Sequence, residues 1–221
     1  MATFKEIKPR ISAVVFDVDN VLVMSEHLHY ESWCRVFAKH GLKDETKTGD
    51  LYPGIGIPDM DYLKMTFPSL KPKELVNIMH EKWDAYLDII KEKIKPDSRT
   101  NAILDNLKLR YKLCAASSTN RDAVELVLTS TGILQKLEFM LGKEDVKKHK
   151  PEPDVYLLAS KKLGLPPYKC VAVEDSLAGV ESAKTAGMYC IAITTSFPRK
   201  RLETARADIV IDKFEELKQL L

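Results

Sequence analysis

The most informative stretch of the chain is residues 12–22, which read SAVVFDVDNVL. Residues 12–16 are apolar or small at both odd and even positions, a pattern typical of a strand buried on both faces of a parallel sheet. Two carboxylates, Asp17 and Asp19, follow this run at positions i and i+2. We therefore expect both in the turn beyond the carboxyl end of a buried strand. A polar turn that merely ends a strand would give the same pair.

Similar apolar runs recur along the chain, and amphipathic stretches of helical length separate them. The predicted strands are residues 12–16, 112–117, 170–174, 189–194 and 208–211, and the predicted helices are residues 100–110, 121–129, 153–163 and 177–186. Alternation of this kind builds right-handed βαβ units. The sequence therefore predicts an α/β fold with a doubly wound parallel-sheet, Rossmann-like core.

Residues 25–95 interrupt this alternation. They contain helical patterns at 29–40, 59–66 and 73–94, separated by prolines and glycines. We predict an α/β catalytic core formed by residues 1–24 and 96–221, with residues 25–95 inserted as an α-helical cap. The insert follows the first strand directly, which would place it over the carboxyl edge of the sheet, where open α/β sheets bind ligands.

Composition and charge exclude several classes of protein. The 221 residues carry 34 basic and 32 acidic side chains, a balance that argues against a nucleic-acid binder. The first ten residues, MATFKEIKPR, lack the apolar run of a signal peptide, and no stretch approaches the roughly 18 apolar residues of a membrane span. The four cysteines form no CxxC pair, which favours reduced core thiols. We expect a cytoplasmic monomer with neither a nucleic-acid nor a membrane partner.

Further polar groups stand at the ends of other predicted strands. Residues 117–120 read SSTN, Lys150 precedes a Pro-x-Pro sequence, and Glu174 and Asp175 end the 170–174 strand. Each group has a simpler explanation when taken alone. Hydroxyls cap helices, a proline commonly opens a helix beside a solvated lysine, and acids near a helix start interact favourably with its dipole.

Taken together and in order, these motifs resemble the haloacid dehalogenase-like hydrolase superfamily, whose members are mostly phosphatases and phosphomutases. The four matching stretches read FDVDNVLV, AASSTN, KHKPEPDVY and VAVEDSLAGVESAKTAGM, and they cover nearly the whole chain. The helical insert resembles the small cap of the subgroup containing β-phosphoglucomutase and phosphoglycolate phosphatase. The resemblance implies a Mg²⁺-dependent phosphatase that hydrolyses a small phosphorylated metabolite, of sugar phosphate or phosphoglycolate type, through an aspartyl-phosphate intermediate.

The resemblance also assigns roles to the acidic residues. Asp17 would attack phosphorus, and Asp19 would protonate the leaving alcohol and later deprotonate water. Mg²⁺ prefers oxygen ligands, and Asp17, the backbone carbonyl of Asp19 and Asp175 would supply them. Glu174 would serve either as a ligand or as a support for one.

The same resemblance implies that Ser117, Ser118 and Lys150 bind the phosphate. The acid at position 19 favours phosphate chemistry over dehalogenation, because a halide leaving group needs no proton. One departure from the family pattern is Asn20, which replaces the usual glycine. Asparagine tolerates left-handed backbone geometry, so the turn can form.

Two residues of the insert, His29 and Trp33, match the HxxxW pattern of the β-phosphoglucomutase subgroup. Residues at i and i+4 also share a helix face, so the pair fits simple packing as well. Gly56, Asn120 and Arg121 complete the set of candidate substrate contacts.

Mutases of the subgroup hold a second phosphate with an arginine and a lysine around a cap glycine. The matching stretch, residues 52–59 (YPGIGIPD), contains no basic residue, and Asp59 stands where the arginine is expected. Because a carboxylate would repel a distal phosphate, we favour a phosphatase over a hexose-phosphate mutase. A third hypothesis, a non-catalytic binding or regulatory member, is disfavoured by the complete set of acidic, hydroxyl and lysine residues.

Overall fold

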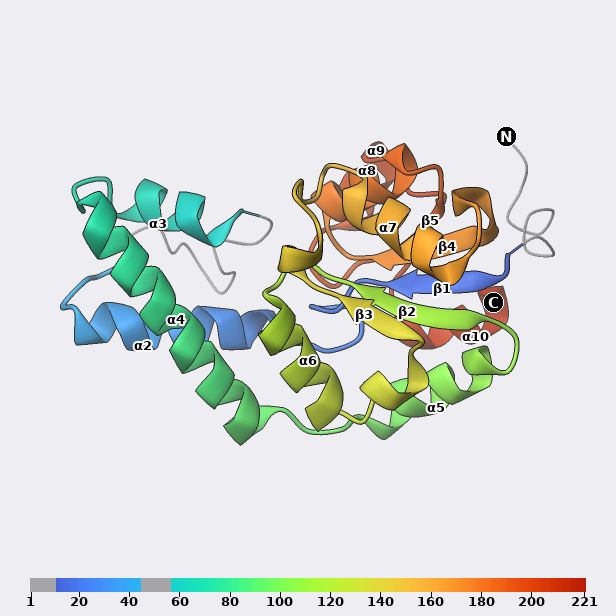
Figure 1. Ribbon diagram of the computed structural model, residues 1–221, viewed down its shortest axis with the longest axis horizontal. Coiled ribbons are helices and arrows are strands. Elements are labelled where there is room, and N and C mark those ends of the chain that lie inside the picture. Colours follow the sequence, from blue (N-terminus) through green and yellow to red (C-terminus); the bar gives the residue numbers. More distant parts are fainter. Residues whose placement is uncertain (1–10, 45–56) are drawn as a thin grey trace. The chain divides into compact units, whose positions relative to one another are not determined.

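The computed structural model describes residues 11–44 and 57–221, and the chain divides into two compact units (Figure 1). The sheet unit comprises Met1–Val23 and Lys95–Leu221. The helical unit comprises Met24–Ile94. Among the described residues, no helix combines the length and the apolar character needed to cross a membrane.

The sheet unit contains a six-stranded, all-parallel sheet with the order β3-β2-β1-β4-β5-β6. Its strands are β1 (Ala13–Phe16), β2 (Lys112–Ala116), β3 (Phe139–Leu141), β4 (Cys170–Glu174), β5 (Tyr189–Ile193) and β6 (Ile209–Ile211). The order reverses at β1, as in a doubly wound sheet, and the predicted α/β fold is confirmed. Strand β3 was not predicted, because its residues Phe-Met-Leu include no β-branched side chain, whereas the equally short β6 reads Ile-Val-Ile.

Helices cover both faces of this sheet: α7, α8 and α9 lie on one side, and α5, α6 and α10 lie on the other (Figure 1). Their bounds are α5 (Ser98–Lys108), α6 (Arg121–Ser130), α7 (Asp154–Leu163), α8 (Leu177–Thr185), α9 (Arg199–Thr204) and α10 (Leu217–Leu220). Single 3₁₀ turns fill the connections at η2 (Leu134–Lys136), η3 (Lys143–Asp145), η4 (Pro167–Lys169) and η5 (Phe214–Glu216).

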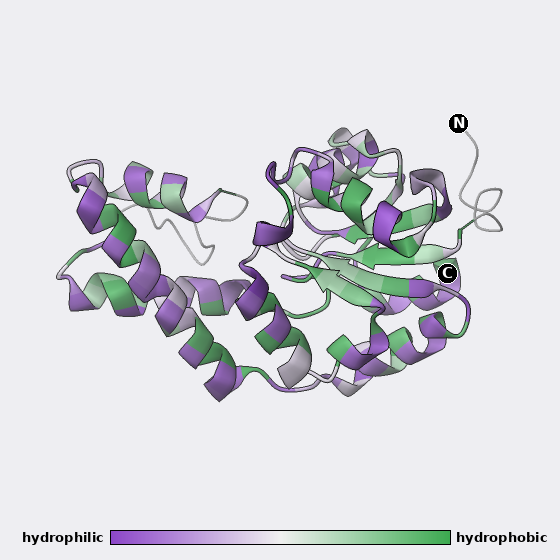
Figure 2. Ribbon diagram, in the orientation of Figure 1, coloured by the Kyte–Doolittle hydropathy of each residue, from purple (hydrophilic) through white to green (hydrophobic). Residues whose placement is uncertain are grey.

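The core of the sheet unit follows from the alternation of side chains along each strand. Ala13 and Val15 of β1 join the hydrophobic cluster that includes Tyr156 of α7, whereas Phe16 points to the opposite face and packs against Phe214. The strands are therefore apolar on both faces, whereas the helices carry apolar stripes only (Figure 2). Cys114, Cys170 and Cys190 are buried free thiols, as predicted, while Cys34 is exposed.

The helical unit contains α2 (Glu26–Lys39), α3 (Asp59–Thr66) and α4 (Pro72–Lys93). Helices α2 and α3 both pack against α4. Their shared core is aromatic, and Trp33 stacks on Phe37 and meets the edge of Tyr62. Proline begins α4, where its missing N–H costs no helical hydrogen bond.

The register of the central strands brings distant parts of the sequence to one edge. Phe16 at the end of β1 pairs with Ala115 of β2 on one side and with Val173 of β4 on the other. Because all three strands are parallel, the residues that follow them emerge together at the carboxyl edge of the sheet.

Candidate active site

Asp17 lies at this edge, anchored by its backbone. Its N–H donates to the carbonyl of Val173 at 2.9 Å, so the β1–β4 ladder continues to the first residue beyond the strand. Ser117 continues the neighbouring ladder in the same way, through its N–H and the carbonyl of Leu141 at 3.0 Å. Only 7% of Asp17 is exposed. The sheet thus holds the backbone of Asp17 at its carboxyl edge, and the residue is buried there.

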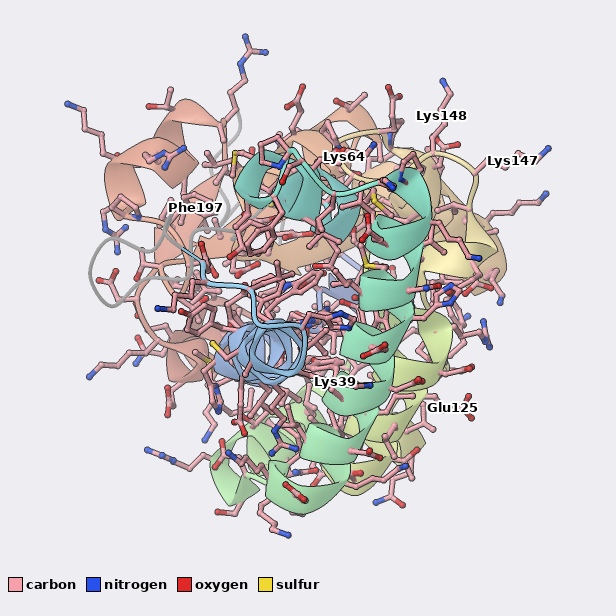
Figure 3. All side chains as sticks on the ribbon, turned by 90° about the vertical axis from the view of Figure 1, so that its left-hand side faces the viewer. Lys39, Lys64, Glu125, Lys147, Lys148 and Phe197 are labelled. Carbon is pink, nitrogen blue, oxygen red and sulfur yellow. The ribbon has the colours of Figure 1, made fainter. Side chains whose placement is uncertain are left out.

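Lys150 enters the same cluster from the segment before α7. Its Nζ donates to Asp17 Oδ1 at 2.6 Å, to Glu174 Oε1 at 2.6 Å and to the carbonyl of Ala116 at 3.0 Å. Burial alone lowers the pKa of Lys150, but Asp17 and Glu174 outweigh it, so the net pKa is raised and the ammonium stays charged. The neighbouring Lys147 and Lys148 are exposed and extend from the surface (Figure 3).

Glu174 is completely buried, and its carboxylate is surrounded by donors. Besides the bond from Lys150, its Oε1 accepts a 2.5 Å hydrogen bond from the Tyr156 hydroxyl, and its Oε2 accepts one from Ser176 Oγ at 3.2 Å. Helix α8 passes so close that a Cβ at Gly179 would lie 2.0 Å from the carboxylate. Glycine at position 179 is therefore what leaves room for this buried acid.

Asp17, Glu174 and Asp175 place carboxylate oxygens within 4.8 Å of one another. Burial raises the pKa of Asp17, with attraction by Lys150 opposing it only in part. Burial, followed by repulsion from Glu174, raises the pKa of Asp175 to about 7. Three buried carboxylates thus share one ammonium group, and this all-oxygen set with surplus negative charge fits a hard divalent cation such as Mg²⁺.

Asp19 is held by the loop after β2. Thr119 Oγ1 donates to Asp19 Oδ2 at 2.7 Å, whereas Ser117 Oγ lies 3.5 Å from the same oxygen. Ser117 Oγ also accepts the N–H of Thr119 at 2.9 Å, which folds the loop back on itself. Thr119 was not predicted as a site residue, although its hydroxyl lies in the same SSTN stretch as the predicted phosphate-binding serines.

A second chain of hydrogen bonds reaches Asp175 from the other side. Asn20 adopts the left-handed conformation expected of the residue that replaces glycine, with φ of 58°. Its side-chain amide donates to Ser196 Oγ at 2.8 Å, and the Ser196 hydroxyl donates to Asp175 Oδ2. Ser196 was also missed, because its position shortly after the end of β5 is its only signal in the sequence.

A family model described as haloacid dehalogenase-like hydrolase matches residues 14–193. The chain belongs to this family. The match confirms the resemblance inferred from the four motifs, and it spans every residue of the cluster around Asp17 except Ser196.

Two phosphatases and one solved structure illustrate the proteins that are similar over most of the chain. A phosphorylated carbohydrates phosphatase from Thermotoga maritima is 34% identical over 182 residues, which cover 80% of this chain and 82% of that protein. The validoxylamine A 7'-phosphate phosphatase of Streptomyces hygroscopicus is 28% identical and covers 92% and 94%. The crystal structure of a β-phosphoglucomutase from Clostridium difficile matches with a TM-score of 0.76 at 26% identity, covering 95% of this chain and 96% of that one.

The other residues predicted near the loop after β2 are Ser118, Asn120 and Arg121, and their contacts differ. Ser118 is exposed, and Asn120 stands at the N-cap of α6 without a capping side-chain bond. Arg121 donates to both carboxylate oxygens of Asp145, at 2.8 and 2.7 Å. A substrate contact by Arg121 would have to compete with this bidentate ion pair.

In the helical unit, Trp33 is part of the aromatic core, whereas His29 makes polar contacts. His29 Nδ1 lies 3.0 Å from the Nζ of Lys82, and its ring stacks on Tyr86 at 3.9 Å. Lys82 is fully buried and forms an ion pair with Asp59 at 2.8 Å. The repulsion expected from Asp59 is therefore offset by Lys82. Gly56 lies outside the described residues.

Proposed function

We propose that the protein is a phosphoric monoester hydrolase that releases inorganic phosphate from a small phosphorylated metabolite. The single observation that carries this proposal is the contact of Lys150 with Asp17 at 2.6 Å, beside Glu174 and Asp175 at the carboxyl edge of the sheet. A cation and a buried carboxylate so placed suit an anionic phosphoryl group and its nucleophile. The two similar phosphatases support the same class of reaction.

In the first step, an Asp17 carboxylate oxygen attacks phosphorus, and the bond between phosphorus and the ester oxygen breaks. Asp19 gives its proton to the departing alcohol oxygen, so the alcohol leaves neutral and Asp17 carries the phosphoryl group. Lys150 balances negative charge on the phosphoryl oxygens, and the hydroxyl of Ser117 donates to one of them. The hydrogen bond from Thr119 keeps Asp19 oriented towards this exchange.

In the second step, Asp19 removes a proton from water as the water oxygen attacks phosphorus. The bond between phosphorus and Asp17 breaks, which releases inorganic phosphate, the free Asp17 carboxylate and a protonated Asp19. The enzyme thus returns to its starting protonation state. Splitting one displacement into two is the benefit of a carboxylate nucleophile, because each step needs only one positioned proton transfer.

The donor set fits a bound Mg²⁺, which we assign to Asp17, Asp175 and the backbone carbonyl of Asp19. When bound, the ion neutralises charge on the phosphate and on the facing carboxylates. Glu174 already accepts hydrogen bonds from Lys150, Tyr156 and Ser176. We therefore assign Glu174 to orienting Lys150 rather than to direct metal binding.

The second candidate function is a hexose-phosphate mutase, which the similarity to a β-phosphoglucomutase structure favours. Lys82 is a buried cation of the helical unit that suits a second phosphate. Its ammonium, however, is paired with Asp59 and lies 3.7 Å from the centre of the Trp83 ring. Because the pair is neutral as a whole, it would hold a doubly charged phosphate poorly, and we retain the phosphatase as the main proposal.

The test is the release of phosphate from p-nitrophenyl phosphate and from a panel of sugar phosphates and phosphoglycolate, with and without Mg²⁺. We expect activity that needs Mg²⁺ and is lost in Asp17→Asn and Lys150→Met, while Lys148→Met, an exposed lysine of the same segment, stays active. A second arm supplies β-glucose 1-phosphate with catalytic glucose 1,6-bisphosphate. Formation of glucose 6-phosphate faster than phosphate release would replace the phosphatase proposal with the mutase.

A further inference from the structure

The loops that follow the adjacent strands β1, β4 and β5 meet at the side chain of Asp175. Asp175 follows β4, Asn20 lies four residues beyond β1, and Ser196 lies three residues beyond β5. Strand β4 pairs with both of the others, through Val173 with Phe16 and with Ile191. The parallel register therefore brings the three side chains together, although Asn20 and Ser196 are 176 residues apart.

The hydrogen bonds in this group run in one direction. A serine hydroxyl has a single proton, and Ser196 gives it to Asp175 Oδ2. The lone pairs of Ser196 Oγ then accept the amide proton of Asn20 at 2.8 Å. A chain of donors that ends on a carboxylate polarises each bond in the same sense, which strengthens the last one. Fixing one oxygen of Asp175 also limits rotation of its carboxylate, and so sets where the other oxygen points.

Asn20 contributes its side chain as well as its backbone conformation to this series of hydrogen bonds. A left-handed residue is needed there, since φ is 58° and the N–H of Asn20 donates to the carbonyl of Val23 at 2.7 Å. Glycine would meet that need without strain. Only a side chain with a donor, however, can reach Ser196. Asn20 as a residue is 5% exposed, and its contact with Ser196 is partly buried.

We propose that Ser196 and Asn20 are positioning residues that hold the Asp175 carboxylate in the orientation it needs to bind Mg²⁺. This inference rests on the proposed function, because it takes Asp175 as a ligand of the metal. Groups that hydrogen-bond to a metal ligand commonly affect metal affinity by about 10- to 100-fold. Ser196 contacts the ligand directly and Asn20 acts through Ser196, so the effect of Ser196 should be the larger.

The experiment titrates the full chain with Mg²⁺ alone, followed by calorimetry. We expect Ser196→Ala to weaken Mg²⁺ binding at least about 10-fold, and Ser196→Thr, which keeps the hydroxyl, to restore most of the affinity. Asn20→Gly keeps the left-handed backbone and removes only the amide, so a smaller loss is expected. The matched control is Thr194→Val, which changes a hydroxyl residue two positions before Ser196. The Thr194 hydroxyl donates to the exposed Asp212 at 2.9 Å and not to Asp175.

Kinetics give a second, independent readout. At saturating Mg²⁺, the KM of Ser196→Ala for p-nitrophenyl phosphate should match that of the parent, while the Mg²⁺ concentration giving half-maximal rate rises with the dissociation constant. A purely structural role for Ser196 would lower the melting temperature in EDTA without changing the Mg²⁺ dependence. That result would overturn the inference.

The controls separate this inference from the proposed function. If Asp175→Asn abolishes Mg²⁺ binding but Ser196→Ala binds like the parent, the positioning role is wrong and the metal site stands. If Asp175→Asn binds Mg²⁺ as the parent does, the metal site itself is wrong and the inference falls with it. Should Ser196→Ala not fold, Asn20→Gly decides, and parental affinity in that variant overturns the proposal.

Discussion

The substitution Asp175→Asn should stabilise the metal-free protein while it abolishes Mg²⁺ binding. Burial and the nearby Glu174 raise the pKa of Asp175, so the folded state ionises this carboxyl with difficulty. The unfolded chain ionises it readily. Asparagine keeps the shape and can still accept the hydrogen bond from Ser196, but it carries no charge to be repelled.

The expected gain follows from the pKa change, which runs from 3.8 to about 7. Each pKa unit corresponds to about 1.4 kcal/mol, so ionised Asp175 costs the folded state at most about 4 kcal/mol. The group binds its proton more tightly when folded. Stability is therefore lost as the pH rises from about 4 to about 7, and the full cost is present above pH 7. Below pH 4 both states are protonated, and the variant gains nothing from this source.

The assay is thermal unfolding of the parent and Asp175→Asn in EDTA at pH 5 and pH 8. Because a buried amide still costs some desolvation, the net gain at pH 8 should lie between about 1 and 4 kcal/mol, or roughly 2–4 °C per kcal/mol in this size range. The gain at pH 5 should be smaller by about 2–3 kcal/mol. Added Mg²⁺ should stabilise the parent only. A variant no more stable than the parent at pH 8, or a gain independent of pH, would refute the reasoning.

Two further substitutions test other parts of the site. Gly179→Ala should destabilise the protein by about 1–3 kcal/mol, since its Cβ would collide with the buried Glu174, and Glu181→Ala on the exposed side of α8 provides the comparison in a denaturant titration. A stabilised Gly179→Ala, as glycine-to-alanine changes in helices usually give, would show that Glu174 is free to move. Thr119→Val removes the 2.7 Å hydrogen bond to Asp19, so it should lower kcat about 10-fold or more with little change in KM. Parental steady-state rates would show that this bond does not position the acid.

Much of the fold was predictable because the relevant signals are local. Buried parallel strands read as apolar runs, and the helices of the insert read as amphipathic stretches bounded by proline and glycine, so β4 and α3 were predicted at their observed bounds. Strand β3 was missed because its Phe-Met-Leu sequence lacks the β-branched residues that mark the equally short β6. Its pairing with β2 is set by the tertiary fold.

For the site, too, the residues in local motifs could be predicted and the contacts between distant residues could not. Asp17, Lys150 and Asp175 could be proposed from motif order, since strand ends of a parallel sheet meet at one edge. The supporting contacts could not, because they join residues far apart in sequence: Thr119 to Asp19, and Lys82 to Asp59. Gly179 was visible as a glycine, but the reason for it is tertiary, because the Glu174 carboxylate lies where a Cβ at position 179 would stand.

The central claim is that the phosphoryl group passes through Asp17. Asp19→Asn should retain attack by Asp17 on p-nitrophenyl phosphate, whose leaving group needs no proton, but lose the base for the second step, a contribution of about 10²–10⁴-fold. Rapid acid quench followed by mass spectrometry should therefore find one added phosphoryl group on Asp19→Asn, mapped to the peptide containing Asp17, and none on the Asp17→Asn/Asp19→Asn double variant. Phosphate release by Asp17→Asn at parental rates, or a label on another residue, would contradict the account.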